Sequence, residues 1–183
     1  MRRISILLAV LLTLIYPLTI WLAEGRIEPR LLAGVLLLAG FARLLSVQTS
    51  PATRWWLPAT ILLVLLAVLG NAMFPLKLYP VIVNAALLGV FAYSLIIPPS
   101  AIERIARMRD PHLPEQAVGY TRRVTQVWCV FFAVNGAIAL YTALYASSAL
   151  WSLYNGFVAY IFIGLLFAGE YCVRRRVMGR QRG

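Results

Sequence analysis

Two long apolar runs decide the fold of this chain. Residues 124–146 have the sequence VTQVWCVFFAVNGAIALYTALYA, and residues 150–173 have the sequence LWSLYNGFVAYIFIGLLFAGEYCV. A helix needs about 20 mostly apolar residues to cross a bilayer, and Glu170 is the one charged residue in the two runs. Since only residues 147–149 separate them, we expect two antiparallel transmembrane helices.

The composition extends this prediction to the whole chain. Of its 183 residues, 62% are hydrophobic and 13% are charged, and the net charge is +11. An average soluble domain is about half apolar and about a quarter charged, so a soluble domain could not cover this much apolar surface. These values argue against a disulfide-rich secreted mini-protein, a disordered chain and an ordinary cytosolic enzyme. We therefore expect one all-α domain over residues 1–183, a polytopic transmembrane helical bundle.

Six apolar runs are candidate spans. They are residues 4–23, 31–47, 55–74, 79–97, 124–146 and 150–173. The second run contains Arg43 and is the weakest candidate, so the number becomes five if this run only dips into the membrane. The first run is longer than the apolar core of a signal peptide, which has about 7–15 residues, and we expect an uncleaved helix there.

The basic residues predict the orientation of the bundle. Cytoplasmic loops of membrane proteins are enriched in Lys and Arg. If both termini are cytoplasmic, every basic residue except Arg26, Arg30 and Lys77 lies on the cytoplasmic side. This asymmetry favours cytoplasmic termini, and it accounts for the high net charge without any binding of nucleic acid.

Residues 100–123 form the longest polar stretch, which we expect to be a cytoplasmic connector between the fourth and fifth spans. Apolar residues at positions 101, 102, 105 and 108 share one face of a helix, and Glu103, Arg104 and Arg107 lie on the other. Such a basic amphipathic helix lies in the membrane surface and attracts anionic lipid; a solvated connector that only sets topology is the alternative. The candidate interface for lipid headgroups or partner proteins consists of Arg104, Arg107, His112, Arg122 and Arg123.

Motifs of known chemistry are absent from the sequence. His112 is the only histidine, and the scattered carboxylates near it have no metal-ligand spacing. Cys129 and Cys172 form no CxxC pair, and no nucleophile elbow, P-loop, dinucleotide fingerprint or HExxH is present. We expect no metal and no cofactor. An interfacial lipid-modifying enzyme that uses Arg107, His112, Arg122 and Arg123 remains an alternative.

Four polar side chains within the predicted spans are candidate functional residues, because polar groups are costly inside a bilayer and therefore informative. They are Asn84, Asn135, Asn155 and Glu170. Asn135 lies about 11 residues into its span, near mid-bilayer at 1.5 Å per residue, and we expect it to bond across helices rather than to bind a ligand. Glu170 precedes Arg174 by one helical turn, a favourable spacing for an ion pair. In a second hypothesis the three asparagines line the path of a transporter or flippase for a lipid or aryl-polyene precursor.

The C-terminal half resembles the bacterial inner-membrane septation protein A family. The similarity begins at residues 99–104 and is closest from Arg122 to Trp151. In the family, a basic pair precedes a tryptophan by five residues, and a W-x-x-F-F pattern follows. Arg123, Trp128 and residues 131–132 match that spacing.

Two positions depart from the family pattern. Ala139 stands where the family tends to have asparagine, and Asn155 stands where it tends to have lysine. The chain is therefore similar to a divergent branch, which looks like membrane proteins found with fatty-acid-like or aryl-polyene synthesis systems. The resemblance implies a non-enzymatic, multi-pass protein of the bacterial inner membrane that supports septation, elongation or lipid handling. Its implied partners are membrane lipids and other envelope-biogenesis proteins, and it implies no catalytic residue.

Overall fold

The described part of the chain is helical. The computed structural model describes residues 17–22, 31, 34, 61, 62, 65, 74–108, 110, 111 and 113–179, the last four of these by their backbone. The elements from residue 74 onward are α4 (Phe74–Lys77), α5 (Tyr79–Ile96), α6 (Ala101–Arg107), α7 (Glu115–Tyr145), α8 (Ser148–Leu153), the π-helix η1 (Tyr154–Val158) and α9 (Ala159–Gly179). No strand occurs in these ranges, so the predicted all-α class is confirmed for this part of the chain.

Three stretches in the described ranges are long and apolar enough to cross a membrane, as expected of a membrane protein. They are Phe74–Ile96, Glu115–Tyr145 and Ser148–Arg175. These correspond to the fourth, fifth and sixth predicted spans. The first three predicted spans lie largely outside the described residues, so a total of six spans and cytoplasmic termini stay predictions.

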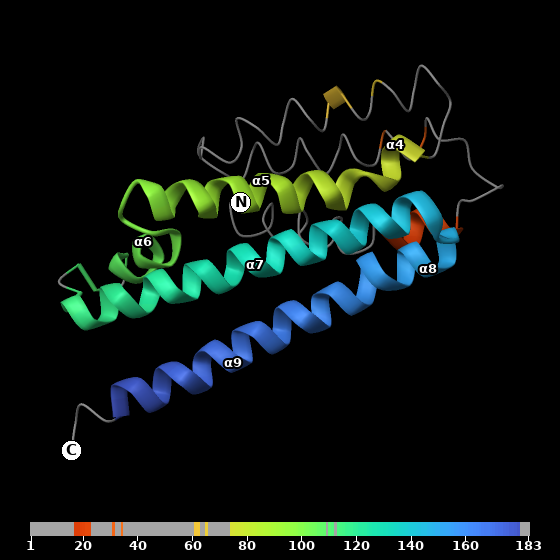
Figure 1. Cartoon of the computed structure of the whole chain (residues 1–183). Helices are drawn as coiled ribbons and strands as arrows, with labels where there is room; N and C mark the ends of the chain where they lie inside the picture. The colour runs from red at the N-terminus through yellow and green to blue at the C-terminus, as the bar shows by residue number, and fades with distance from the viewer. Residues whose placement is uncertain are drawn as a thin grey trace, which may run out of the picture.

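The three long helices run back and forth beside one another (Figure 1). α5 leads to α6 at one end of the bundle, α7 returns along α5 to the other end, and α8, η1 and α9 lead back toward α6. We call the end formed by α6, the first turns of α7 and the last turns of α9 the polar end. Helices α5 and α7 form the most extensive contact in this bundle.

A regular seam on α7 produces that contact. Its buried residues are Thr121, Thr125, Trp128, Phe132, Asn135, Ala139, Thr142 and Ala143. Up to Thr142 the steps between them alternate between four and three residues, which is the spacing of a seam between two packed helices. The seam mixes aromatic, small and polar side chains, so it positions polar groups inside the bundle.

α7 begins earlier than predicted, at Glu115 instead of Val124. Residues 115–123 therefore belong to the helix, and the connector ends at Pro114. Glu115 favours a helix start here because a carboxylate stabilises the helix N-terminus. The 31 residues of α7 span about 46 Å at 1.5 Å per residue, more than the roughly 30 Å hydrocarbon core. α7 is therefore longer than the hydrocarbon core, and its first turns carry the charged residues Glu115, Arg122 and Arg123.

α6 packs on α7 through an unexpected face. The prediction placed Glu103 on the exposed face, but the structure leaves it only 5% exposed. Burial is tolerated because the carboxylate accepts the Ser100 N–H at 3.3 Å and pairs with Arg107 at 2.8 Å. The α6 backbone is tied to α7 by the Ile102 N–H, which donates to Thr125 Oγ1 at 3.3 Å. The apolar side chains of Ile105 and Met108 are exposed instead.

The opposite end is held by α4 and α8. The Lys77 ammonium donates to the Ser148 hydroxyl, and the indole N–H of the fully buried Trp151 donates to the Lys77 carbonyl at 3.2 Å. The Ser152 hydroxyl donates to the Pro17 carbonyl at 2.7 Å, which brings the helical residues 17–22 against this end. These bonds hold α8 in position directly before η1 begins at Tyr154.

Candidate functional site

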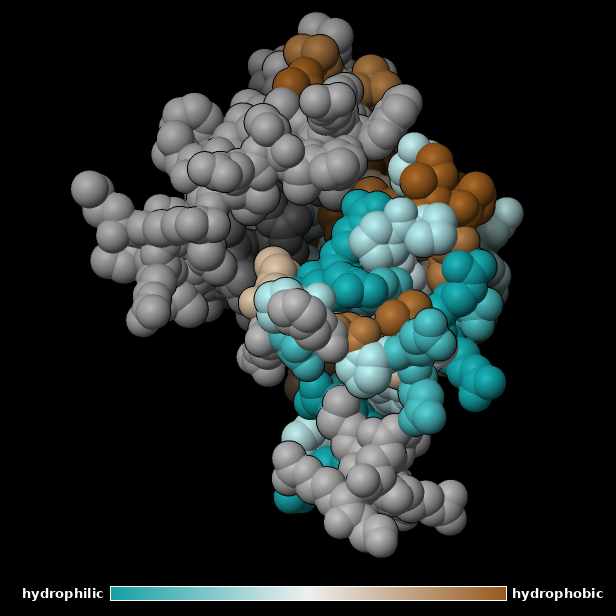
Figure 2. Space-filling model, turned by 90° about the vertical axis from the view of Figure 1, so that its left-hand side faces the viewer, coloured by the Kyte–Doolittle hydropathy of each residue, from teal (hydrophilic) through white to brown (hydrophobic). Residues whose placement is uncertain are grey.

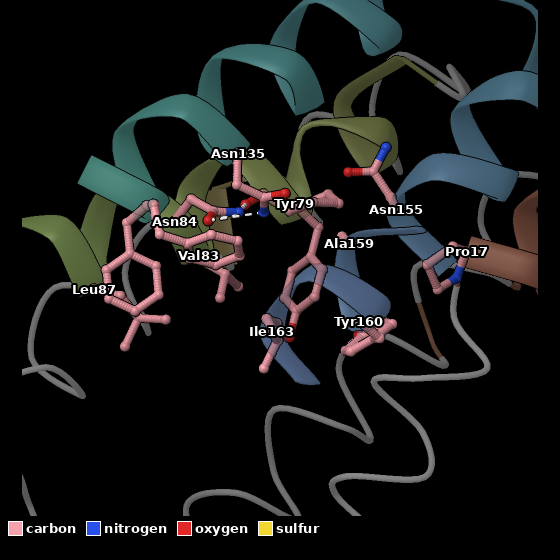
Figure 3. A pocket seen from close by; sticks show the side chains of 13 residues that line it. Pro17, Tyr79, Val83, Asn84, Leu87, Asn135, Asn155, Ala159, Tyr160 and Ile163 are labelled. Carbon is pink, nitrogen blue, oxygen red and sulfur yellow. Dashed lines mark hydrogen bonds between the residues drawn. The ribbon is translucent and has the colours of Figure 1, made fainter. Parts of the chain in front are cut away.

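Three buried asparagines from three elements border one cavity. Asn84 lies on α5, Asn135 on α7 and Asn155 in η1, and they are 7%, 6% and 5% exposed, respectively. The cavity has a volume of about 170 Å³ (Figure 3), and we call it the asparagine cavity. Its other lining residues are Pro17, Tyr79, Pro80, Val83, Leu87, Phe131, Phe132, Ala159, Tyr160 and Ile163. The structure thus gathers the three intramembrane asparagines that the sequence singled out.

A directional chain of hydrogen bonds links the first two asparagines. Asn84 Nδ2 donates to the Pro80 carbonyl at 2.8 Å. A carbonyl can only accept, so the amide nitrogen of Asn84 must face it, and Oδ1 is left to accept from Asn135 Nδ2 at 3.0 Å. Asn135 Oδ1 in turn accepts from the Tyr154 hydroxyl at 2.9 Å. This amide chain joins α5, α7 and η1, and the Pro80 carbonyl sets its direction.

A glycine permits the approach of α5 and α7 beside this chain. A Cβ added at Gly136 would lie 3.1 Å from the Cβ of Asn84, closer than ordinary van der Waals contact. Small residues let neighbouring membrane helices come close together. Gly136 therefore allows Asn84 and Asn135 to meet at hydrogen-bond distance.

The third asparagine is held differently, within the wide turn of η1. Thr142 Oγ1 donates to the Ala139 carbonyl at 3.0 Å, so it accepts from Asn155 Nδ2 at 3.2 Å. Asn155 Nδ2 also donates to the Trp151 carbonyl at 2.9 Å. These acceptors fix the position of the amide nitrogen, and Oδ1 points the other way, toward the side where Asn84 and Asn135 lie (Figure 3). Among the described residues, no group donates a hydrogen bond to this oxygen.

An aromatic cluster lies beside the cavity, toward the polar end. Phe132 packs edge to face on Phe91 at 5.2 Å between ring centroids, and Trp128 lies 5.5 Å from Phe132. Trp128 also contacts Phe167 on α9 at 4.9 Å. The cluster holds α5, α7 and α9 together at this level, and two of its members, Phe131 and Phe132, form part of the apolar wall of the cavity.

The predicted basic interface lies at the polar end, where hydrophilic side chains gather (Figure 2). Arg104, Arg122 and Arg123 are exposed there. Arg107 is held by Glu103 and by the Pro111 carbonyl, to which it donates at 3.2 Å. His112 lies outside the described residues. Arg107 lies on α6, whereas Arg122 and Arg123 lie on α7.

Glu170 has local partners, as its spacing predicts. Its carboxylate lies 3.7 Å from the Arg174 guanidinium. It also accepts from the Tyr120 hydroxyl at 3.3 Å, and the same hydroxyl donates to the Glu170 backbone carbonyl at 3.2 Å. Glu170 therefore ties the last turns of α9 to the first turns of α7, away from the asparagine cavity.

Sequence reasoning missed two members of the site, Tyr154 and Thr142. Both pack on a predicted intramembrane asparagine, but which tyrosine or threonine would do so depends on the rotation of α7 and η1. Within the described ranges, no group of His, Cys, Asp and Glu is arranged to hold a metal ion, and Cys129 and Cys172 are free thiols.

The described helices fit a membrane protein, and no described residue that lines its asparagine cavity carries a charged side chain. Comparison with protein-family models, curated proteins and solved structures gives no match. The likeness to the septation protein A family therefore stays a prediction.

Proposed function

We propose that this protein is a non-enzymatic protein of the bacterial inner membrane that holds the polar end of a lipid-like molecule in the asparagine cavity, in support of cell-envelope biogenesis. The observation that carries the proposal is the meeting of Asn84, Asn135 and Asn155 at one cavity. Apolar walls with a few convergent polar groups are typical of small-molecule sites.

The size of the cavity indicates how much of a ligand it holds. An engineered protein cavity of about 150 Å³ accommodates one benzene molecule. At about 170 Å³, the asparagine cavity suits a group of similar size and is too small for a complete lipid. The acyl chain of the ligand would therefore lie outside the cavity, in the surrounding bilayer.

Helix packing alone is a weak reason for three buried asparagines where α5, α7 and η1 meet. Polar bonds between membrane helices contribute on average about 0.6 kcal/mol, and apolar side chains could fill the same seam. Within the described ranges, no group donates a hydrogen bond to the Asn155 oxygen. A ligand would use this oxygen.

The polar end supports the membrane setting of the proposal. An exposed arginine near an anionic leaflet contributes on the order of 1 kcal/mol of attraction, and Arg104, Arg122 and Arg123 lie together at this end. These residues would hold anionic headgroups around the bundle. The role in the envelope rests on the family resemblance of residues 99–151.

Native mass spectrometry of the full-length protein purified in mild detergent tests the proposal. Ile163→Trp places a large side chain in the cavity, whereas Leu165→Trp adds the same side chain at a 61% exposed position of α9. We expect a co-purified lipid on the wild type and on Leu165→Trp, and its loss from Ile163→Trp. Equal lipid occupancy in all three, or none in the wild type, would overturn the proposal.

Lipid transport is a second candidate function, because the same three asparagines would form its polar path. Proteoliposomes with a fluorescent lipid that has an uncharged, hydroxyl-bearing headgroup in both leaflets would show it as bleaching of the inner-leaflet dye by an external reductant. We expect transport to be lost in Asn135→Leu and kept in Gln126→Leu, which removes an exposed amide from the same helix. Bleaching no faster than in protein-free vesicles would exclude this function.

A further inference from the structure

We infer that the asparagine cavity selects an uncharged polar group that both donates and accepts hydrogen bonds, such as the hydroxyls of a monoacylglycerol. This inference rests on the proposed function and specifies the ligand of the same site. It follows from three features of the cavity: its unused hydrogen-bonding atoms, the absence of charged side chains among its described lining residues, and its size.

The unused hydrogen-bonding atoms are of both kinds. Asn84 Nδ2 and Asn135 Nδ2 each carry two N–H groups, and each donates one bond to an acceptor in the described part of the chain. One N–H of each amide is therefore left to donate. Asn155 Oδ1 supplies the opposite kind, a free acceptor within the described ranges. A ligand that satisfies all of these must present an acceptor to Asn84 or Asn135 and a donor to Asn155, and a hydroxyl can do both.

The described lining of the cavity disfavours charged lipid headgroups. Among the described residues that line the cavity there is no Lys, Arg, Asp, Glu or His. A phosphate or carboxylate placed there would lose its hydration without gaining a countercharge, which is strongly unfavourable. The arginines that could pair with a phosphate lie instead at the polar end. The cavity therefore favours a neutral group over a phosphate.

Size restricts the choice further. A cavity of about 170 Å³ suits a group of about six non-hydrogen atoms, by comparison with the cavity of about 150 Å³ that holds benzene. A glyceryl group has this size and carries two free hydroxyls when one position is esterified.

Three probes with the same chain length test the inference on the purified full-length protein. They are 1-monooleoylglycerol, which is neutral with hydroxyls, 1-oleoyl lysophosphatidic acid, which is anionic, and 1-octadecene, which has no polar end. The readout is the shift in melting temperature as each probe is titrated. We expect a saturable increase with monooleoylglycerol that is absent in Ile163→Trp, and no cavity-dependent increase with the other two probes.

Asn155→Leu tests the accepting oxygen, and Gln126→Leu is its control because it removes an exposed amide on α7. One neutral hydrogen bond corresponds to about a fivefold change in affinity. We therefore expect monooleoylglycerol to bind about fivefold or more weakly to Asn155→Leu and unchanged to Gln126→Leu. The probe comparison uses the wild type and Ile163→Trp, so it decides the matter even if Asn155→Leu does not fold.

The outcomes separate this inference from the proposed function. If lysophosphatidic acid stabilises the wild type as well as monooleoylglycerol does, and Ile163→Trp abolishes both effects, the cavity holds lipids but does not select a neutral group. The inference is then overturned and the proposed function stands. If no probe acts through the cavity and no lipid co-purifies with the wild type, both are overturned.

Discussion

Gly136 on α7 lies against Asn84 on α5, so closely that a Cβ added to the glycine would lie 3.1 Å from the Cβ of Asn84. The next residue back on α7, Asn135, donates its amide hydrogen bond to Asn84. The close approach at Gly136 and the bond from Asn135 therefore depend on each other, and together they hold one wall of the asparagine cavity.

Gly136→Ala should separate the two helices at this point. Inserting a methyl group into a packed core costs about 1–3 kcal/mol, and the displaced Asn84 would weaken its bond with Asn135. We expect a lower melting temperature and weaker lipid retention. Gly89→Ala on α5 is the control, since nothing lies within 4 Å of its added Cβ. Equal destabilisation by the two changes would contradict the role given to Gly136.

The bond between Asn84 and Asn135 should appear as an energetic coupling. In a double-mutant cycle of Asn84→Leu and Asn135→Leu, measured by reversible unfolding in mixed micelles, we expect about 0.6 kcal/mol and at most roughly 1.7 kcal/mol. A second cycle that pairs Asn84→Leu with Gln126→Leu should give no coupling, because Gln126 is exposed on α7. Additive effects in the first cycle would show that the two amides act independently.

Tyr154→Phe should release the other end of the amide chain. The change removes the hydroxyl that donates to Asn135 Oδ1 and leaves a buried acceptor without its partner, at a cost of about 1 kcal/mol in the free energy of unfolding. Tyr141→Phe on α7 is the matched control. That tyrosine is exposed, and its hydroxyl makes no hydrogen bond within the described ranges. A Tyr154→Phe variant as stable as Tyr141→Phe would show that the hydrogen bond from Tyr154 to Asn135 does not stabilise the protein.

The positive-inside distribution predicts that the polar end faces the cytoplasm. In a background with Cys129→Ala and Cys172→Ala, single cysteines can be placed at the exposed positions Met108 and Tyr145. A membrane-impermeant maleimide should label Tyr145→Cys in spheroplasts and Met108→Cys only after permeabilisation. The reverse pattern would invert the orientation.

The spans at residues 79–97, 124–146 and 150–173 were predictable because hydropathy is a local property of the sequence. The bond of Asn135 across helices was also predictable, since a buried amide in a bilayer needs a partner. Its partners were not, because Asn84 and Tyr154 meet it only through the rotation of three helices. The π-helix η1 changes the helical rotation at Tyr154 and Asn155, which sequence spacing does not predict.

The connector shows where local pattern fails. The helical spacing of the apolar residues placed Glu103 on the opposite, exposed face, but a buried carboxylate is stable when an N–H and a guanidinium satisfy it. Both groups lie within one turn of the same helix, Ser100 before Glu103 and Arg107 after it. The spacing of these residues in the sequence makes both contacts possible. Only the packing of α6 on α7 decides that this face of α6 is buried.

The occupancy of the asparagine cavity is tested most directly by photolabelling the protein in its membrane. The probe is a monoacylglycerol with a diazirine at the second carbon of its acyl chain, and the labelled peptides are identified by mass spectrometry. The proposal predicts that the label attaches within residues 79–87 and 155–163 of the wild type and of Leu165→Trp, and that it is lost from these residues in Ile163→Trp. Labelling of these segments that Ile163→Trp leaves unchanged, or labelling confined to the exposed outer face of α9, would contradict it.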